Sequence, residues 1–130
     1  MPAFGKTSQE RLATCDKRIQ DVFNEVIKHF DCTVACGTRS KEEQDKAVAE
    51  GKSKTPYPKS KHNSNPSMAV DAYPYPVDFN DTNRMRYFAG FVMGIAASKG
   101  IKLRWGGDWN QDTQLKDNSF NDLPHFELVD

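Results

Sequence analysis

The sequence lacks several features that would assign a function directly. Lysine plus arginine equal aspartate plus glutamate at 18 each, so no net charge attracts a polyanion such as nucleic acid. The first ten residues hold no apolar run typical of a secretion signal. The longest apolar run, at 88–97, is too short to span a bilayer. We therefore expect neither nucleic-acid binding nor membrane insertion.

Cysteine is also scarce, and the chain has only Cys15, Cys32 and Cys36. An odd number of cysteines without a secretion signal argues against a disulfide framework. In a strand, Cys32 and Cys36 would share one face but lie about 13 Å apart, which is too far for a disulfide or a shared metal. We expect all three to be small core residues.

Length and hydrophobic spacing predict the architecture. With 130 residues, 37% hydrophobic and 28% charged, the chain fits a single domain over residues 1–130, which we expect to be a monomer. Helical spacing of apolar residues predicts a long helix over 8–30, with Thr7 and Glu10 as its capping box. Two further helices are predicted from Ser40 to about residue 49 and from about residue 81 to Gly100.

Short strands are predicted at 33–36, 69–73, 101–105 and 125–129. Several of them follow one another too closely for βαβ units. The predicted fold class is α+β, with a small, mainly antiparallel sheet packed with about three helices.

A long polar loop separates the second helix from the second strand. Loops of this length inside a domain are uncommon and often functional. Its residues 52–61 contain four lysines and no acid. A solvated loop is favoured over a patch that attracts anions, and the sequence leaves both open.

Three side chains in or near strands have the chemistry of a metal site. Asp71 interrupts an apolar strand, where it must face solvent, pair with a cation or bind a metal; exposure at an edge is favoured from composition alone. His125 follows Pro124 and by itself suits a structural role. His62 lies in the polar loop. Two histidines and one aspartate suit a catalytic zinc with an open fourth position, but no HExxH motif is present.

The order of these residues resembles a known family, the zinc D-alanyl-D-alanine carboxypeptidases and related L-alanyl-D-glutamate peptidases. The family pattern is Ser-x-His, then Gly-x-Ala-x-Asp, then an acid three residues before a second His. This chain has Ser-Lys-His at 60–62, Ser-Met-Ala-Val-Asp at 67–71 and Asp-Leu-Pro-His at 122–125. The phage endolysin branch is most similar, through Phe-Gly-Lys at 4–6 and Gly-Asp-Trp-Asn at 107–110.

The resemblance implies one zinc ion per chain in a surface cleft, held by His62, Asp71 and His125. It also implies that Asp122 is the catalytic acid/base. A regular strand would place Asp122 and His125 on opposite faces, so a turn at residues 123–124 would have to bring them together. Arg39, in Gly-Thr-Arg-Ser at 37–40, matches the family arginine that stabilises negative charge on the substrate.

Other residues are candidates for supporting roles. Ser60, from the Ser-x-His motif, is a candidate for substrate binding. Trp105 and Trp109 flank a Gly-Gly turn, where core packing is favoured over a wall of the substrate cleft. Glu127 shares the predicted face of His125 and is a candidate hydrogen-bond partner for it.

Two departures from the family pattern affect the site. Eight residues separate His62 from Asp71 where the family usually has six, and Ser67 replaces the family glycine. The base is an aspartate, as in the endolysin branch, whereas carboxypeptidases commonly use glutamate.

By this resemblance, the expected function is a zinc-dependent peptidoglycan endopeptidase, an endolysin that hydrolyses the L-Ala–D-Glu bond of the stem peptide with metal-activated water. The alternatives are a D-Ala-D-Ala carboxypeptidase and a non-catalytic wall-binding module with structural zinc. Asp122 argues against the module, because a closed structural site needs no adjacent base. The resemblance further implies accumulation in the host cytoplasm and holin-assisted release to the cell wall.

Overall fold

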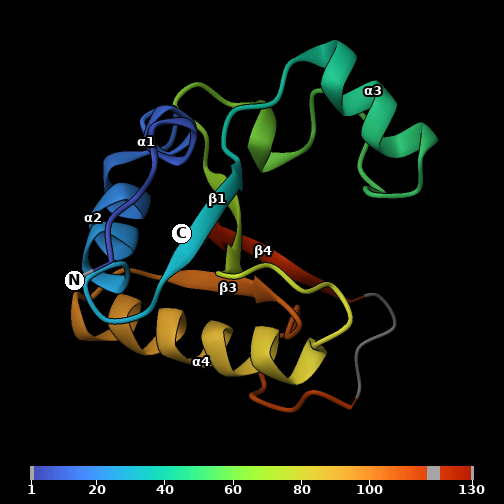
Figure 1. Cartoon of the computed structure of the whole chain (residues 1–130). Coiled ribbons are helices and arrows are strands. Elements are labelled where there is room, and N and C mark those ends of the chain that lie inside the picture. Colours follow the sequence, from blue (N-terminus) through green and yellow to red (C-terminus); the bar gives the residue numbers. More distant parts are fainter. Residues whose placement is uncertain (1, 117–120, 130) are drawn as a thin grey trace.

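A four-stranded antiparallel sheet organises the chain in this computed structural model, which describes residues 2–116 and 121–129 (Figure 1). The strands are β1 (Cys32–Cys36), β2 (Ala69–Pro74), β3 (Leu103–Gly106) and β4 (Asp122–Leu128). Their order across the sheet is β1-β2-β4-β3, and each neighbouring pair is antiparallel. The predicted α+β class and antiparallel sheet are therefore confirmed.

The described residues form four α-helices: α1 (Lys6–Leu12), α2 (Lys17–Val26), α3 (Lys41–Ala49) and α4 (Thr82–Ser98). The prediction of one helix over 8–30 is wrong, because Asp16 starts a new helix there. Its side chain accepts a hydrogen bond from the Arg18 backbone N–H at 2.9 Å. Both α1 and α2 turn apolar side chains to the core, so the hydrophobic spacing continues through the break.

The predicted cap at Thr7 is also wrong, since α1 begins at Lys6, two residues earlier than predicted, and its N-cap Gly5 has no side chain to cap it. The Ser40 capping box is confirmed by both of its hydrogen bonds with Glu43. Asp81 caps α4, which agrees with the helix start predicted at about residue 81. Among the described residues, no helix is long and apolar enough to cross a membrane.

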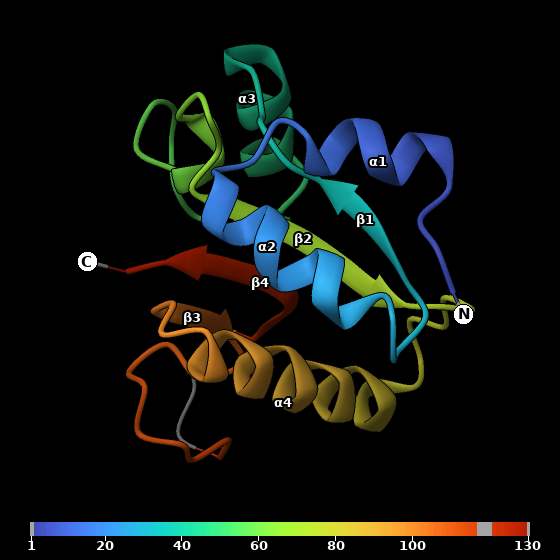
Figure 2. The same cartoon turned by 90° about the vertical axis from the view of Figure 1, so that its left-hand side faces the viewer.

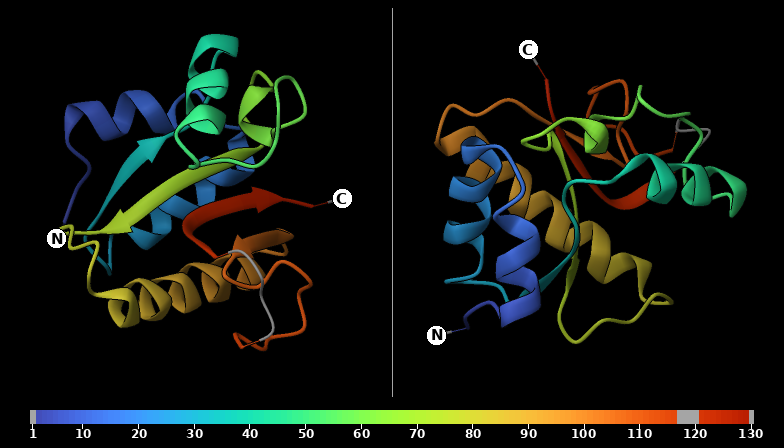
Figure 3. Two further views of the ribbon diagram at one scale, coloured as in Figure 1. Left: turned by 90° about the vertical axis from the view of Figure 1, so that its right-hand side faces the viewer. Right: turned by 90° about the horizontal axis from the view of Figure 1, so that it is seen from above.

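The core lies between the sheet and the helices α2 and α4. Phe126 of β4 is fully buried and packs edge-to-face against Phe23 of α2 and Phe88 of α4, at centroid distances of 5.7 and 6.3 Å. Figure 2 views the molecule from the side of these two helices. Seen from above, α1 and α2 lie on one side of the sheet and α3 lies on the other (Figure 3).

Strand alternation gives the second face of the sheet its polar character. Val70 and Phe126 point to the core, so their neighbours Asp71 and His125 point to the opposite face. The same alternation in β3 and β4 places Arg104 and Glu127 there as a cross-strand pair. The second face thus gathers ionisable side chains from three strands.

Candidate metal centre

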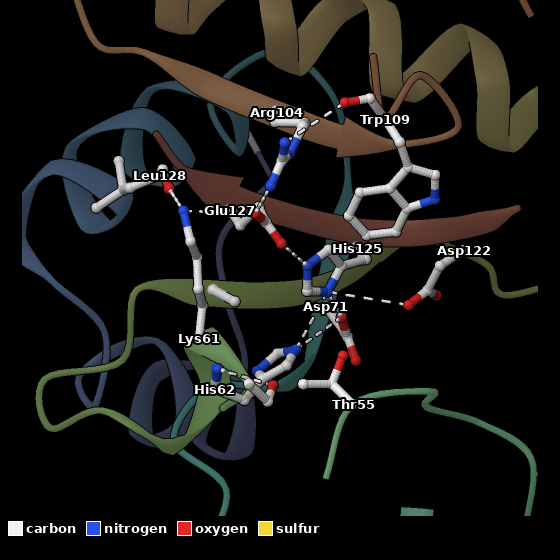
Figure 4. Close-up of polar contacts among 12 residues, drawn as sticks. Thr55, Lys61, His62, Asp71, Arg104, Trp109, Asp122, His125, Glu127 and Leu128 are labelled. Carbon is white, nitrogen blue, oxygen red and sulfur yellow. Dashed lines mark hydrogen bonds and ion pairs between the residues drawn. The ribbon is translucent and has the colours of Figure 1, made fainter. Parts of the chain in front are cut away.

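Three side chains from separate elements converge on that face (Figure 4). His62 lies in η1, a 3-10 helix over Lys61–Asn63, while Asp71 and His125 are cross-strand partners in β2 and β4. His62 Nε2 lies 3.2 Å from Asp71 Oδ1 and 3.3 Å from His125 Nδ1, and His125 Nδ1 lies 3.2 Å from Asp71 Oδ1. The three atoms form a nearly equilateral triangle.

Local hydrogen bonds deliver His62 to the sheet. Ser60 is the N-cap of η1, and its hydroxyl accepts from the His62 backbone N–H at 3.2 Å. The His62 carbonyl in turn accepts from the Arg39 backbone N–H at 2.7 Å. These bonds fix both ends of the residue, whose side chain is almost fully buried.

The remaining ring nitrogens define the tautomers of the two histidines. His62 Nδ1 lies 2.7 Å from the Gly37 carbonyl oxygen, and His125 Nε2 lies 2.8 Å from Glu127 Oε1. A carbonyl and a carboxylate only accept, so both nitrogens must carry hydrogen. In their neutral form, the two rings would each direct a lone pair toward Asp71, so three acceptor atoms would face one point and a cation or added protons would satisfy them.

The pKa values of the three residues agree with a site that attracts positive charge. Burial lowers the pKa of His62, but its hydrogen bond to Asp71 leads the opposing effects, which raise the pKa to about 10. The pKa of His125 rises to about 8 in the same way, through Asp71 and Glu127. Burial disfavours the charged form of Asp71, yet hydrogen bonds from both histidines hold its pKa well below the usual range.

Asp122 lies beside the triangle and outside it. Trp105 pairs with Phe126, but the next residue, Gly106, pairs with Asp122, so residues 123–125 form a bulge in β4. The predicted turn at residues 123–124 does not form, because these residues stay in β4, and the register shift instead brings Asp122 Oδ2 to 3.9 Å from His125 Nδ1. Burial, followed by the charge of Asp71, raises the pKa of Asp122 to about 6.

Arg39 borders the triangle on the side of Asp71. Its Nη2 lies 3.4 Å from Asp71 Oδ2, and its Nη1 donates to Gln44 Oε1 at 3.0 Å. Its side chain is only 14% exposed, so these two contacts fix the direction of the guanidinium.

A cleft with a cavity volume of about 380 Å³ opens onto these groups, and its lining includes Arg39, Ser60, Asp122 and Trp109. The Trp109 ring packs against the His125 ring at a centroid distance of 5.4 Å. Trp105 lies in the core instead, where its Nε1 donates to the Leu123 carbonyl at 2.7 Å. Of the two tryptophans, Trp109 lines the cleft and Trp105 does not.

Comparisons with known proteins agree with this geometry. The family model described as phage L-alanyl-D-glutamate peptidase matches residues 2–129. The chain belongs to this family. It is 32% identical over 135 residues to the L-alanyl-D-glutamate peptidase of Escherichia phage T5, with 97% of each chain covered. It also resembles the crystal structure of Serratia marcescens L-Ala D-Glu endopeptidase ChiX, with a TM-score of 0.74 and 25% identity over 98% of this chain and 90% of that one.

The departures from the family pattern are accommodated locally. Ser67 is fully buried, and its hydroxyl both donates to the Ala69 carbonyl at 2.6 Å and accepts from the Ala69 N–H. In the longer segment after His62, the Ser64 hydroxyl bonds to the carbonyls of Lys61 and Pro66. Hydrogen bonds within the segment therefore hold the longer loop together, and His62 still reaches the sheet.

The predicted contact between Glu127 and His125 is confirmed by their 2.8 Å hydrogen bond. The sequence did not indicate the cations around Glu127. Arg104 Nη2 lies 2.6 Å from Glu127 Oε2, and Lys61 Nζ lies 3.4 Å from the same oxygen. The alternation that buries Leu103 and Trp105 places Arg104 on the opposite face, but only strand pairing brings it to Glu127.

Cys36 departs from the expectation that all three cysteines are core residues. Cys15 and Cys32 are buried, whereas Cys36 is half-buried and its Sγ lies 3.9 Å from His62 Nδ1. A register shift in β1 between Val34 and Cys36 turns this end of the strand toward the site. Cys36 is also the cross-strand partner of Asp71, and its Sγ lies within 4.8 Å of a ring nitrogen of His62 and a carboxylate oxygen of Asp71.

Proposed function

We propose that this protein is a zinc-dependent peptidase that hydrolyses the L-Ala–D-Glu bond of the peptidoglycan stem peptide. The observation that carries the proposal is the triangle of His62, Asp71 and His125. Tetrahedral zinc with ligands at about 2.0–2.1 Å requires ligand atoms about 3.3–3.4 Å apart. The separations of 3.2, 3.2 and 3.3 Å match that requirement. Three protein ligands leave the fourth position that catalytic sites keep open.

When bound, zinc would supply a Lewis acid that polarises the scissile carbonyl and makes water more acidic. Asp122 would accept a proton from the attacking water and deliver it to the leaving amine. A pKa near 6 suits both steps, because the carboxylate is mostly ionised at neutral pH and still basic. Arg39, on the other side of Asp71, would stabilise the negative charge that develops on the carbonyl oxygen.

The choice of bond is supported by the family and by the names of the two relatives, each an L-alanyl-D-glutamate or L-Ala D-Glu peptidase. Digestion of purified muropeptides, followed by mass spectrometry, tests it. Cleavage between the first two stem residues supports the proposal. Release of terminal D-alanine would instead favour the carboxypeptidase, and binding of wall fragments with zinc present and no turnover would favour the wall-binding module.

We also keep the proposals that the protein is a monomeric single domain and reaches the wall from the host cytoplasm with a holin. Light scattering on the purified protein tests the monomer. Expression with and without a holin, with lysis as the readout, tests the release route.

A further inference from the structure

The lysine-rich segment 52–61 forms one wall of the cleft. All four of its lysines line the cavity, together with two arginines, whereas only two acids do so. This excess is local, because the chain as a whole has no net charge. The basic residues are Arg39, Lys52, Lys54, Lys59, Lys61 and Arg104, and the acids are Asp122 and Glu127.

A buried amide fixes this wall to the site. Gln44 of α3 is fully buried, and its Nε2 donates to the Thr55 carbonyl at 2.7 Å and to Ser53 Oγ at 3.0 Å. Its Oε1 accepts from Arg39 Nη1 at 3.0 Å and from Asn63 Nδ2 at 3.3 Å. Thr55 accordingly lines the same cavity as His62, and both are drawn in Figure 4. The lysine segment is therefore a fixed part of the cleft and not a detached solvated loop.

The cations of the cleft differ in how they are compensated. Arg104 and Lys61 pair with Glu127, and Lys52 pairs with Glu50 at 3.2 Å. Lys59 has no acidic group within 4.0 Å among residues 2–116 and 121–129. Lys59 is an exposed residue that lines the cleft, so it is available to an anionic ligand.

The substrate of the proposed function supplies such an anion. In an L-Ala–D-Glu bond, glutamate contributes its amino group and keeps two carboxyl groups. The rest of the stem peptide can be attached through only one of them. We propose that the lysine wall, through Lys59, binds the remaining free carboxylate and thereby selects stem peptides that carry it over peptides in which it is an amide. This inference rests on the proposed function and names the group that the site recognises.

The test compares two peptides that differ only at that group, one with the free carboxylate and one with the carboxamide. Wild-type protein should show a higher kcat/KM for the carboxylate. Lys59→Gln should lower kcat/KM for the carboxylate about three- to fivefold and reduce the preference, and Lys59→Arg should restore it. Lys99→Gln, at the end of α4 outside the cleft, is the matched control and should leave the preference unchanged. Added salt should weaken the preference, because it screens exposed charges.

Equal cleavage of both peptides by the wild type would overturn the carboxylate subsite and leave the proposed function intact. An equal loss on both peptides in Lys59→Gln would overturn it as well, because Lys59 would then act on the cleft in general. Cleavage of neither peptide by zinc-loaded wild-type protein would overturn the proposed function, and the subsite with it.

Discussion

Glu127→Gln tests how the surrounding residues hold the proposed zinc ligand His125 in place. The carboxylate of Glu127 accepts from His125 Nε2 at 2.8 Å and pairs with Arg104 and Lys61. Glutamine keeps the size of the side chain and removes the charge. The change should therefore affect both the stability of the metal-free protein and its affinity for zinc.

The size of the effect follows from the pKa of Glu127. Burial would raise this pKa, but the hydrogen bonds from His125 and Arg104 lower it from 4.5 to about 2. That difference corresponds to about 3 kcal/mol of stabilisation above pH 4.5, which is lost as the pH falls toward 2. Arg104 and Lys61 are 30% and 37% exposed, so solvent screening reduces the expected loss to about 2 kcal/mol. Zinc affinity should fall about 10- to 100-fold.

Denaturant unfolding at pH 7 with a chelator present measures the first effect, and competition with a chelating dye measures the second. Glu10→Gln, on the exposed side of α1, is the matched control and should change neither. The difference between wild type and Glu127→Gln should also shrink below pH 4.5. Unchanged stability together with unchanged zinc affinity would refute the role given to Glu127.

Three further variants test other parts of the structure. Asp122→Asn should retain zinc and lower kcat about 10²- to 10⁴-fold. We expect the activity of the wild type to fall as the pH drops through about 6, and this variant should not show that fall. Loss of zinc would instead make Asp122 a ligand. Gly106→Ala would place a Cβ 2.1 Å from the Asp122 carbonyl oxygen, so activity should fall while zinc remains bound. Full activity in a kinetic assay would contradict this contact. Phe126→Ala should cost about 3–5 kcal/mol in denaturant unfolding, because Phe126 packs against Phe23 and Phe88; a loss below 1 kcal/mol would contradict its central position.

The sequence predicted the helices that begin at strong local signals. It failed where two helices share one continuous hydrophobic pattern. The Ser40 capping box placed the start of α3, and the start predicted at about residue 81 agrees with the Asp81 cap of α4. The break before α2 was missed because the apolar spacing is continuous across it. Its local signal was Asp16, a favoured N-cap residue.

The site was predictable in residue type and less so in arrangement. The resemblance selected His62, Asp71 and His125, but residue spacing alone left Asp71 and His125 with structural alternatives. Strand register decides the arrangement, since it pairs Asp71 with His125. The position of Gln44 was not predictable, because it lies in a polar helix and its partners lie in the segments before and after that helix, 5 to 19 residues away.

X-ray absorption spectroscopy at the zinc edge, on protein purified with zinc available, tests the central claim directly. The triangle predicts one zinc per chain, surrounded by nitrogen and oxygen at about 2.0–2.1 Å with the scattering pattern of two imidazoles. Cys36 borders the site, but the proposed set of ligands contains no sulfur. Absence of zinc, or a sulfur neighbour at about 2.3 Å, would contradict a site formed by His62, Asp71 and His125.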